Sequence, residues 1–155
     1  METKLSLEKD TLDALQDLMV ANLDSAKTLK EAAEKIDHGA IENLFRGVAV
    51  ARVGNAEELK SYLKVNAEKP VEDESTIGSE AHRQWMGLRA AINSGDPKVL
   101  LIETERAEDK IKGTYEQLLV DTAGSAMNDV LMGQYRQVKK HHDLIRDLRD
   151  SALAN

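Results

Sequence analysis

Two stretches of the sequence carry residue types that bind metal ions or move protons. The stretch VKKHHDLIRDLRD places His141 and His142 side by side, and ETERAEDK contains Glu105 and Glu108, one helical turn apart. Imidazole nitrogens and carboxylate oxygens are ligands for iron, manganese and zinc. Because the chain contains no cysteine, any metal site in it must be built from oxygen and imidazole ligands.

The full pattern of a di-iron or di-manganese bundle is absent from this sequence. That pattern takes one Glu from each of two helices and a Glu-x-x-His from each of the other two. Val138 and Lys139 stand three positions before the two histidines, where glutamates are needed. A reduced metal site of Glu105, Glu108 and His142 remains one reading. The other is a buried His142 that hydrogen-bonds to one of these glutamates without metal.

The composition indicates that helices must position these side chains. Charged residues make up 32% of the chain and aromatic residues only 3%, and the apolar share comes mainly from Leu, Ala, Val and Ile. This balance is typical of helices rather than sheets. With 155 residues, we expect one all-α domain spanning residues 1–155.

Turn signals divide the chain into four long helices and one short helix. We expect Gly39 to end the first helix in a left-handed conformation, Ser79 to cap the short helix, and Asp96 with Pro97 to begin the next helix. Ser125 caps the last helix. The expected ranges are 7–37, 40–67, 79–92, 97–120 and 125–153. They predict an up-down-up-down four-helix bundle with the extra short helix between the second and third long helices.

Polar residues interrupt the apolar stripe of every long helix near its middle. The stripes themselves follow alternating spacings of three and four residues. If the interruptions meet at one height, they form a central polar layer of Asn22, Arg52, Asn55, Glu108 and His142. The positive charge of Arg52 favours a salt bridge to Glu108 over a second metal ion. Adjacent helix residues point about 100° apart, so we expect His141 to face outward.

The charge and hydropathy patterns exclude several classes of function. The net charge of −7 repels a phosphate backbone, so nucleic acid is not an expected partner. No apolar run approaches a membrane span, and the first residues lack the apolar stretch of a signal peptide. We therefore expect no membrane association and a cytoplasmic location. Phosphate-binding loops and hydrolase motifs are also missing, and no catalytic residue is assigned.

Several longer stretches resemble a known family. GSEAHRQWMGLRAAINSGDPKVLLIETERAEDKIKGTYEQLL, followed by HDLIRDLRD, is similar to a bacterial family of uncharacterised proteins placed in the ferritin-like superfamily. NLDSAKTLKEAAEKI and AVARVGNAEEL in the first half of the chain resemble it more weakly. The resemblance implies a ferritin-like four-helix bundle and carries no settled activity. The superfamily suggests a role in stress physiology.

Two hypotheses about function remain. The first is a non-catalytic ferritin-like bundle with an internally paired polar layer, acting structurally or through a protein partner. The second is a metal-binding protein that holds iron, manganese or zinc at Glu105, Glu108 and His142. No cofactor is required by the first hypothesis. His82 and Trp85 in the short helix are expected to make core or homodimer contacts before any chemistry.

Overall fold

The chain folds into helices, as the composition predicted. The computed structural model describes residues 8–66 and 80–154, with side chains described for residues 8–64 and 86–151. In these ranges there are five helices and no strand: α1 (Lys9–Lys35), α2 (Gly39–Asn66), α3 (Glu80–Ile92), α4 (Pro97–Asp121) and α5 (Ala126–Ala154). The all-α prediction and the short helix between the second and third long helices are confirmed.

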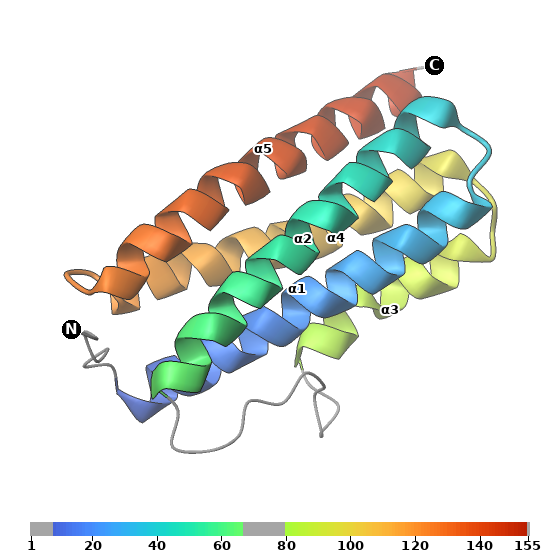
Figure 1. Ribbon diagram of the computed structural model, residues 1–155. Helices are drawn as coiled ribbons and strands as arrows, with labels where there is room; N and C mark the ends of the chain where they lie inside the picture. Colours follow the sequence, from blue (N-terminus) through green and yellow to red (C-terminus); the bar gives the residue numbers. More distant parts are fainter. Residues whose placement is uncertain (1–7, 67–79, 155) are drawn as a thin grey trace.

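The four long helices lie side by side, and α3 packs along α1 and α4 (Figure 1). Successive helices from α1 to α5 run in opposite directions (Figure 1). Because α3 adds one reversal, α2 and α4 run in the same direction, and the long helices follow an up-down-down-up order. The up-down-up-down order expected from the sequence is therefore wrong. It neglected the reversal of chain direction that α3 adds between α2 and α4.

A single apolar core fills the space between the helices. α1 packs mainly against α2 and also contacts α4, while α5 packs mainly against α4 and has fewer contacts with α2. The helices α1 and α5 are therefore diagonal neighbours, as are α2 and α4. Every long helix contributes fully buried side chains, including Leu15, Leu29, Phe45, Leu59, Ile111, Tyr115, Leu131, Val138 and Ile145. Along each helix these residues are separated by combinations of three- and four-residue steps, the spacing of an apolar stripe.

The start of α4 has the capping chemistry that the sequence predicted. The side chain of Asp96 accepts a hydrogen bond from the backbone nitrogen of Lys98 at 2.9 Å, and Pro97 occupies the first turn, where it sacrifices no helical hydrogen bond. Gly95 before it has a φ of 67°, which favours glycine. The chain therefore turns sharply between α3 and α4.

The end of α1 differs from the prediction. Gly39 has no positive φ and is the first residue of α2. The chain leaves α1 instead through Ile36, which is extended and only 6% exposed. The helix therefore ends at an extended, buried Ile36 and not at a glycine in the left-handed conformation. The Nδ1 atom of His38 then accepts a hydrogen bond from the backbone nitrogen of Ile41 at 3.3 Å, in the manner of a helix cap. The predicted cap Ser79 lies outside the described residues.

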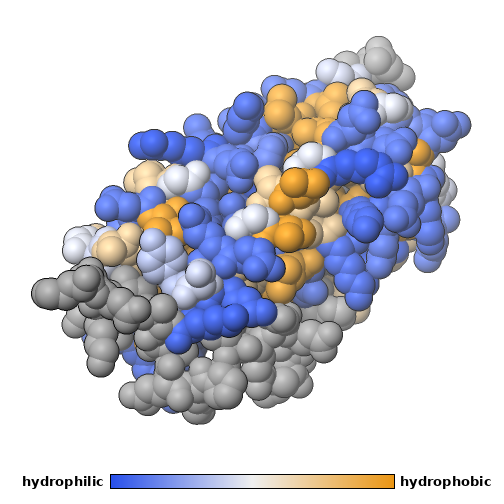
Figure 2. All heavy atoms as spheres, viewed as in Figure 1, coloured by the Kyte–Doolittle hydropathy of each residue, from blue (hydrophilic) through white to orange (hydrophobic). Residues whose placement is uncertain are grey.

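The surface formed by α2 and α5 is mostly hydrophilic, with small hydrophobic patches over both helices (Figure 2). The large hydrophobic side chains that the structure describes as exposed on these helices are Val50, Val53, Met132 and Leu144. None of the described helices combines the length and apolar character that a membrane crossing needs.

Two glycine-to-alanine substitutions are expected to change stability in opposite directions. Gly124, between α4 and α5, has a φ of 84°, so Gly124→Ala should destabilise the fold by about 1–2 kcal/mol. Gly133 lies exposed inside α5, where an added methyl group would meet no neighbouring side chain within 4 Å. Gly133→Ala should therefore stabilise the fold by about 0.5–1 kcal/mol. Urea denaturation measures both values. Equal signs for the two variants would contradict the turn geometry.

Candidate functional site

All five residues expected in the polar layer are buried. Asn22, Arg52 and Glu108 are 0% exposed, and Asn55 and His142 are 7% and 6% exposed. Buried polar groups are costly unless they are hydrogen-bonded. The hydrogen-bond partners of these five side chains therefore decide whether the interior of the bundle could bind a metal ion.

Asn22 and Asn55 belong to a hydrogen-bonded ring that passes through all four long helices. The amide nitrogen of Asn22 on α1 donates to the Tyr115 hydroxyl on α4 at 3.1 Å, and this hydroxyl donates to Gln134 Oε1 on α5 at 2.7 Å. Gln134 Nε2 donates to the backbone oxygen of Asn55 on α2 at 3.2 Å. Asn55 Nδ2 returns to Asn22 Oδ1 at 3.4 Å. The ring is closed within the protein.

The polar layer predicted from the sequence includes neither Tyr115 nor Gln134. A signal for Gln134 was present, because it stands between Leu131 and Val138 at the three- and four-residue spacing of buried positions. A glutamine at such a position is an interruption like Asn22. Burial raises the pKa of Tyr115 to about 12, so the hydroxyl keeps its proton and remains a donor to Gln134.

Arg52 and Glu108 form an ion pair inside the bundle. Nη2 of Arg52 on α2 donates to Oε2 of Glu108 on α4, across the diagonal of the bundle, and both side chains are 0% exposed. Burial raises the pKa of Glu108, while the charge and hydrogen bond of Arg52 oppose this shift. Arg52 Nε, Arg52 Nη1 and Glu108 Oε1 have no hydrogen-bond partner among the described residues.

The ion pair and the ring occupy two adjoining levels of the bundle. Glu108 and Tyr115 are seven residues apart on α4, which corresponds to about 10 Å along the helix axis. On α2, Arg52 and Asn55 are only three residues apart, so the long arginine side chain spans part of this separation. The polar interior is therefore deeper than a single layer.

We expected His141 to face outward, but its side chain is partly buried. Its Nδ1 atom is buried and has no hydrogen-bond partner in the described part of the chain. Burial, followed by the positive charges of Arg52 and Lys140, lowers the pKa of His141 to about 4. Because α4 and α2 cover two different sides of α5, adjacent residues about 100° apart on α5 are both able to point at a neighbouring helix.

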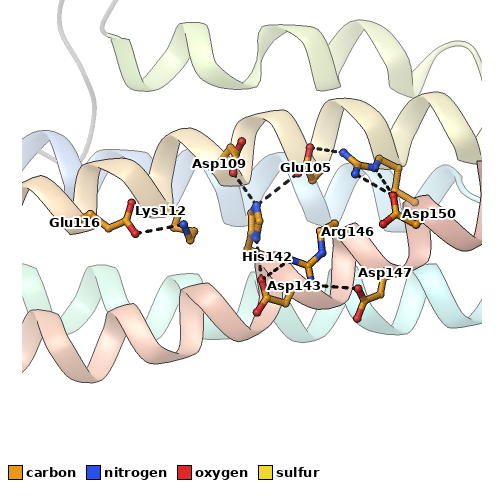
Figure 3. Close-up of polar contacts among 10 residues, drawn as sticks. Glu105, Asp109, Lys112, Glu116, His142, Asp143, Arg146, Asp147 and Asp150 are labelled. Carbon is orange, nitrogen blue, oxygen red and sulfur yellow. Dashed lines mark hydrogen bonds and ion pairs between the residues drawn. The ribbon is translucent and has the colours of Figure 1, made fainter.

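The ring of His142 lies beside carboxylates of α4 (Figure 3). Among the described residues, it makes no hydrogen bond to the hydrogen-bonded ring of Asn22, Tyr115, Gln134 and Asn55. The Nε2 atom of His142 lies 2.7 Å from Asp109 Oδ1 and 3.6 Å from Glu105 Oε1, and its Nδ1 atom lies 3.2 Å from Asp143 Oδ1. Among the residues expected to bind metal, the structure brings Glu105 and His142 together. It places Glu108 with Arg52 instead.

Asp109 replaces Glu108 in this cluster because of helix geometry. At about 100° per residue, Asp109 is turned about 40° from Glu105 in one direction, whereas Glu108 is turned about 60° in the other. The helix α5 lies on the Asp109 side of α4, and α2 faces Glu108. From the spacing along α4, either Glu108 or Asp109 could share an ion with Glu105. Only the position of α5 shows that Asp109 is the one beside His142.

Two arginines of α5, Arg146 and Arg149, contact carboxylates of the His142 cluster, and Figure 3 labels Arg146. Arg149 Nη1 lies 2.8 Å from Glu105 Oε2, and Arg146 Nη1 lies 3.4 Å from Asp143 Oδ1. Each arginine contacts a carboxylate that also lies within 4 Å of His142. The side chains of His82 and Trp85, which the sequence singled out, lie outside the described residues.

The arrangement of helices is that of a ferritin-like helical bundle, as the sequence resemblance implied. A mutant of Dps1 from Mycobacterium smegmatis has a TM-score of 0.70 to this structure, covering 90% of this chain and 95% of that chain. The two sequences are 13% identical, so the likeness shows the fold. The family described as "Domain of unknown function (DUF2383)" matches residues 10–121, and the chain belongs to this family. No curated protein matches the sequence.

Removal of the Glu108 carboxylate is expected to destabilise the protein strongly. Glu108→Ala leaves Arg52 as a buried charge without its partner, at a cost of about 3–5 kcal/mol. Glu42→Ala is the matched control, because Glu42 pairs with Arg46 at 3.2 Å on the surface and the loss there should be about 0.5 kcal/mol. Urea denaturation compares the variants. Similar losses in both would contradict the burial of the Arg52 pair.

His141 is expected to make stability depend on pH. The ring has a pKa of 6.5 in the unfolded reference and about 4 in the fold. The unfolded chain therefore binds a proton that the folded chain excludes, and the free energy of unfolding falls as the pH decreases between these values. His141→Gln should lose less stability than the parent protein between about pH 7 and pH 5. NMR titration of the ring checks the cause, and a midpoint at or above 6.5 would refute it.

Proposed function

We propose that this protein is a non-catalytic ferritin-like bundle whose interior is occupied by its own paired polar side chains. Its role is structural or carried by a protein partner. The observation that supports this proposal is the buried ion pair between Arg52 and Glu108. As part of the same proposal, we assign the protein a role in stress physiology, which the likeness to a ferritin-like fold supports.

The charge of Arg52 opposes metal chemistry in the bundle centre. Bundles that bind two metal ions direct carboxylates and imidazoles from all four helices toward one point. Here the only carboxylate at the level of Arg52 that the described residues place at 0% exposure is Glu108, and it contacts the guanidinium. A second cation at that point would be repelled by Arg52 at short range. The amides and hydroxyl of the neighbouring ring bond to one another.

If the protein acts through a protein partner, the partner must bind its outer surface. Val50 is 75% exposed and Val53 is 43% exposed on α2, which faces the viewer in Figure 2. A protein partner or a second copy of the chain would cover these valines and remove apolar area from water. This part of the proposal concerns the surface and does not require any reaction in the interior.

The test of the proposed function is aerobic oxidation of Fe²⁺ by purified protein. We expect the rate to equal that of buffer, because the ring and the ion pair are built from protein groups that bond to one another. The variant Glu108→Gln should show the same background rate. Oxidation faster than buffer that disappears in Glu108→Gln would refute a non-catalytic interior.

A further inference from the structure

The cluster around His142 has donor atoms at spacings suited to a metal ion. One ligand atom each from Glu105, Asp109 and His142 lies within 4.8 Å of the other two. Nitrogen and oxygen ligands about 2.0–2.2 Å from an ion are separated from one another by about 3–4 Å. The distance of 3.6 Å from His142 Nε2 to Glu105 lies within this range, and the distance of 2.7 Å to Asp109 lies just below it. The Asp109 side chain is 61% exposed and therefore has room to adjust.

The ring of His142 is also oriented for an ion. Its Nδ1 atom faces Asp143 Oδ1 at 3.2 Å, and a carboxylate on one ring nitrogen commonly fixes the other nitrogen toward a metal. The other ring nitrogen, Nε2, faces Asp109 Oδ1 at 2.7 Å, so it points at one of the oxygens that would share an ion with it.

We propose that Glu105, Asp109 and His142 bind one divalent transition-metal ion between α4 and α5, outside the paired interior of the bundle. One nitrogen and two oxygen ligands suit Zn²⁺, Fe²⁺ or Mn²⁺ better than Ca²⁺, which takes six to eight oxygens. Zn²⁺ binds most tightly of these three in the general order of affinities. Exposed Asp109 leaves the remaining coordination positions open to water.

Arg149 limits the affinity of this site without blocking it. Its guanidinium contacts Glu105 Oε2 at 2.8 Å, while Oε1 is the oxygen nearer to His142. Glu105 therefore has one oxygen for Arg149 and one for the ion. The positive charge of Arg149 nevertheless reduces the attraction of Glu105 for a cation. Arg149→Gln should tighten binding, a change opposite in sign to that of the ligand variants.

The experiment is calorimetric titration of tag-free protein with Zn²⁺, with Co²⁺ absorption as a second readout. We expect one ion per chain and a loss of affinity of about 100-fold in His142→Ala. Asp109→Asn changes an exposed residue and should reduce affinity without affecting the fold. Asp143→Asn should reduce it by about 10–100-fold through the orientation of the ring. His141→Ala is the matched control, since it removes the adjacent imidazole and leaves the three ligands in place.

The outcomes separate this site from the proposed function. Stoichiometric Zn²⁺ binding that is lost in His142→Ala and Asp109→Asn and kept in His141→Ala supports the site. Absence of stoichiometric binding, or binding that survives both ligand variants, overturns it. Fe²⁺ oxidation that depends on Glu108 would refute the non-catalytic interior and leave the Zn²⁺ result unaffected, because Glu108 is not a ligand here.

Discussion

The guanidinium of Arg52 and the carboxylate of Glu108 meet inside the bundle, where neither is exposed to water. Removing an ion from water costs several kcal/mol, so each group is tolerable only beside the other. The pair joins α2 to α4 across the diagonal of the bundle. Sliding either helix along its axis would pull the two charges apart, so the pair favours one register of α2 relative to α4.

The hydrogen-bonded ring extends the same constraint to the other two helices. Asn22, Tyr115 and Gln134 each come from a different helix, and the ring closes through Asn55 on α2. A shift of one residue along any helix turns its side chain by about 100° and breaks two of the contacts. Apolar side chains in the core tolerate such shifts more readily. The polar residues therefore select one packing of the helices, while the apolar stripes supply the stabilising burial.

The positions of the helices could be predicted from local sequence. The features that depend on contacts between helices could not. Asp96 begins α4 at the predicted residue because capping needs only neighbours in the chain. The predicted end of α1 was wrong because the end of this helix depends on the burial of Ile36, which other helices provide. The same limit applies to the candidate sites. Burial of Glu108 was predictable from its stripe, but its separation from Glu105 depends on which side of α4 carries α5.

The adjacent histidines show how one helix meets two opposite electrostatic environments. Burial, followed by the positive charges of Arg52 and Lys140, lowers the pKa of His141 to about 4 and keeps the ring neutral. His142 lies among the carboxylates of Glu105, Asp109 and Asp143. The cation site that we propose lies between α4 and α5, away from the positive charge that Arg52 holds in the interior. A carboxylate and histidine site in this bundle is consequently consistent with an interior that binds no metal.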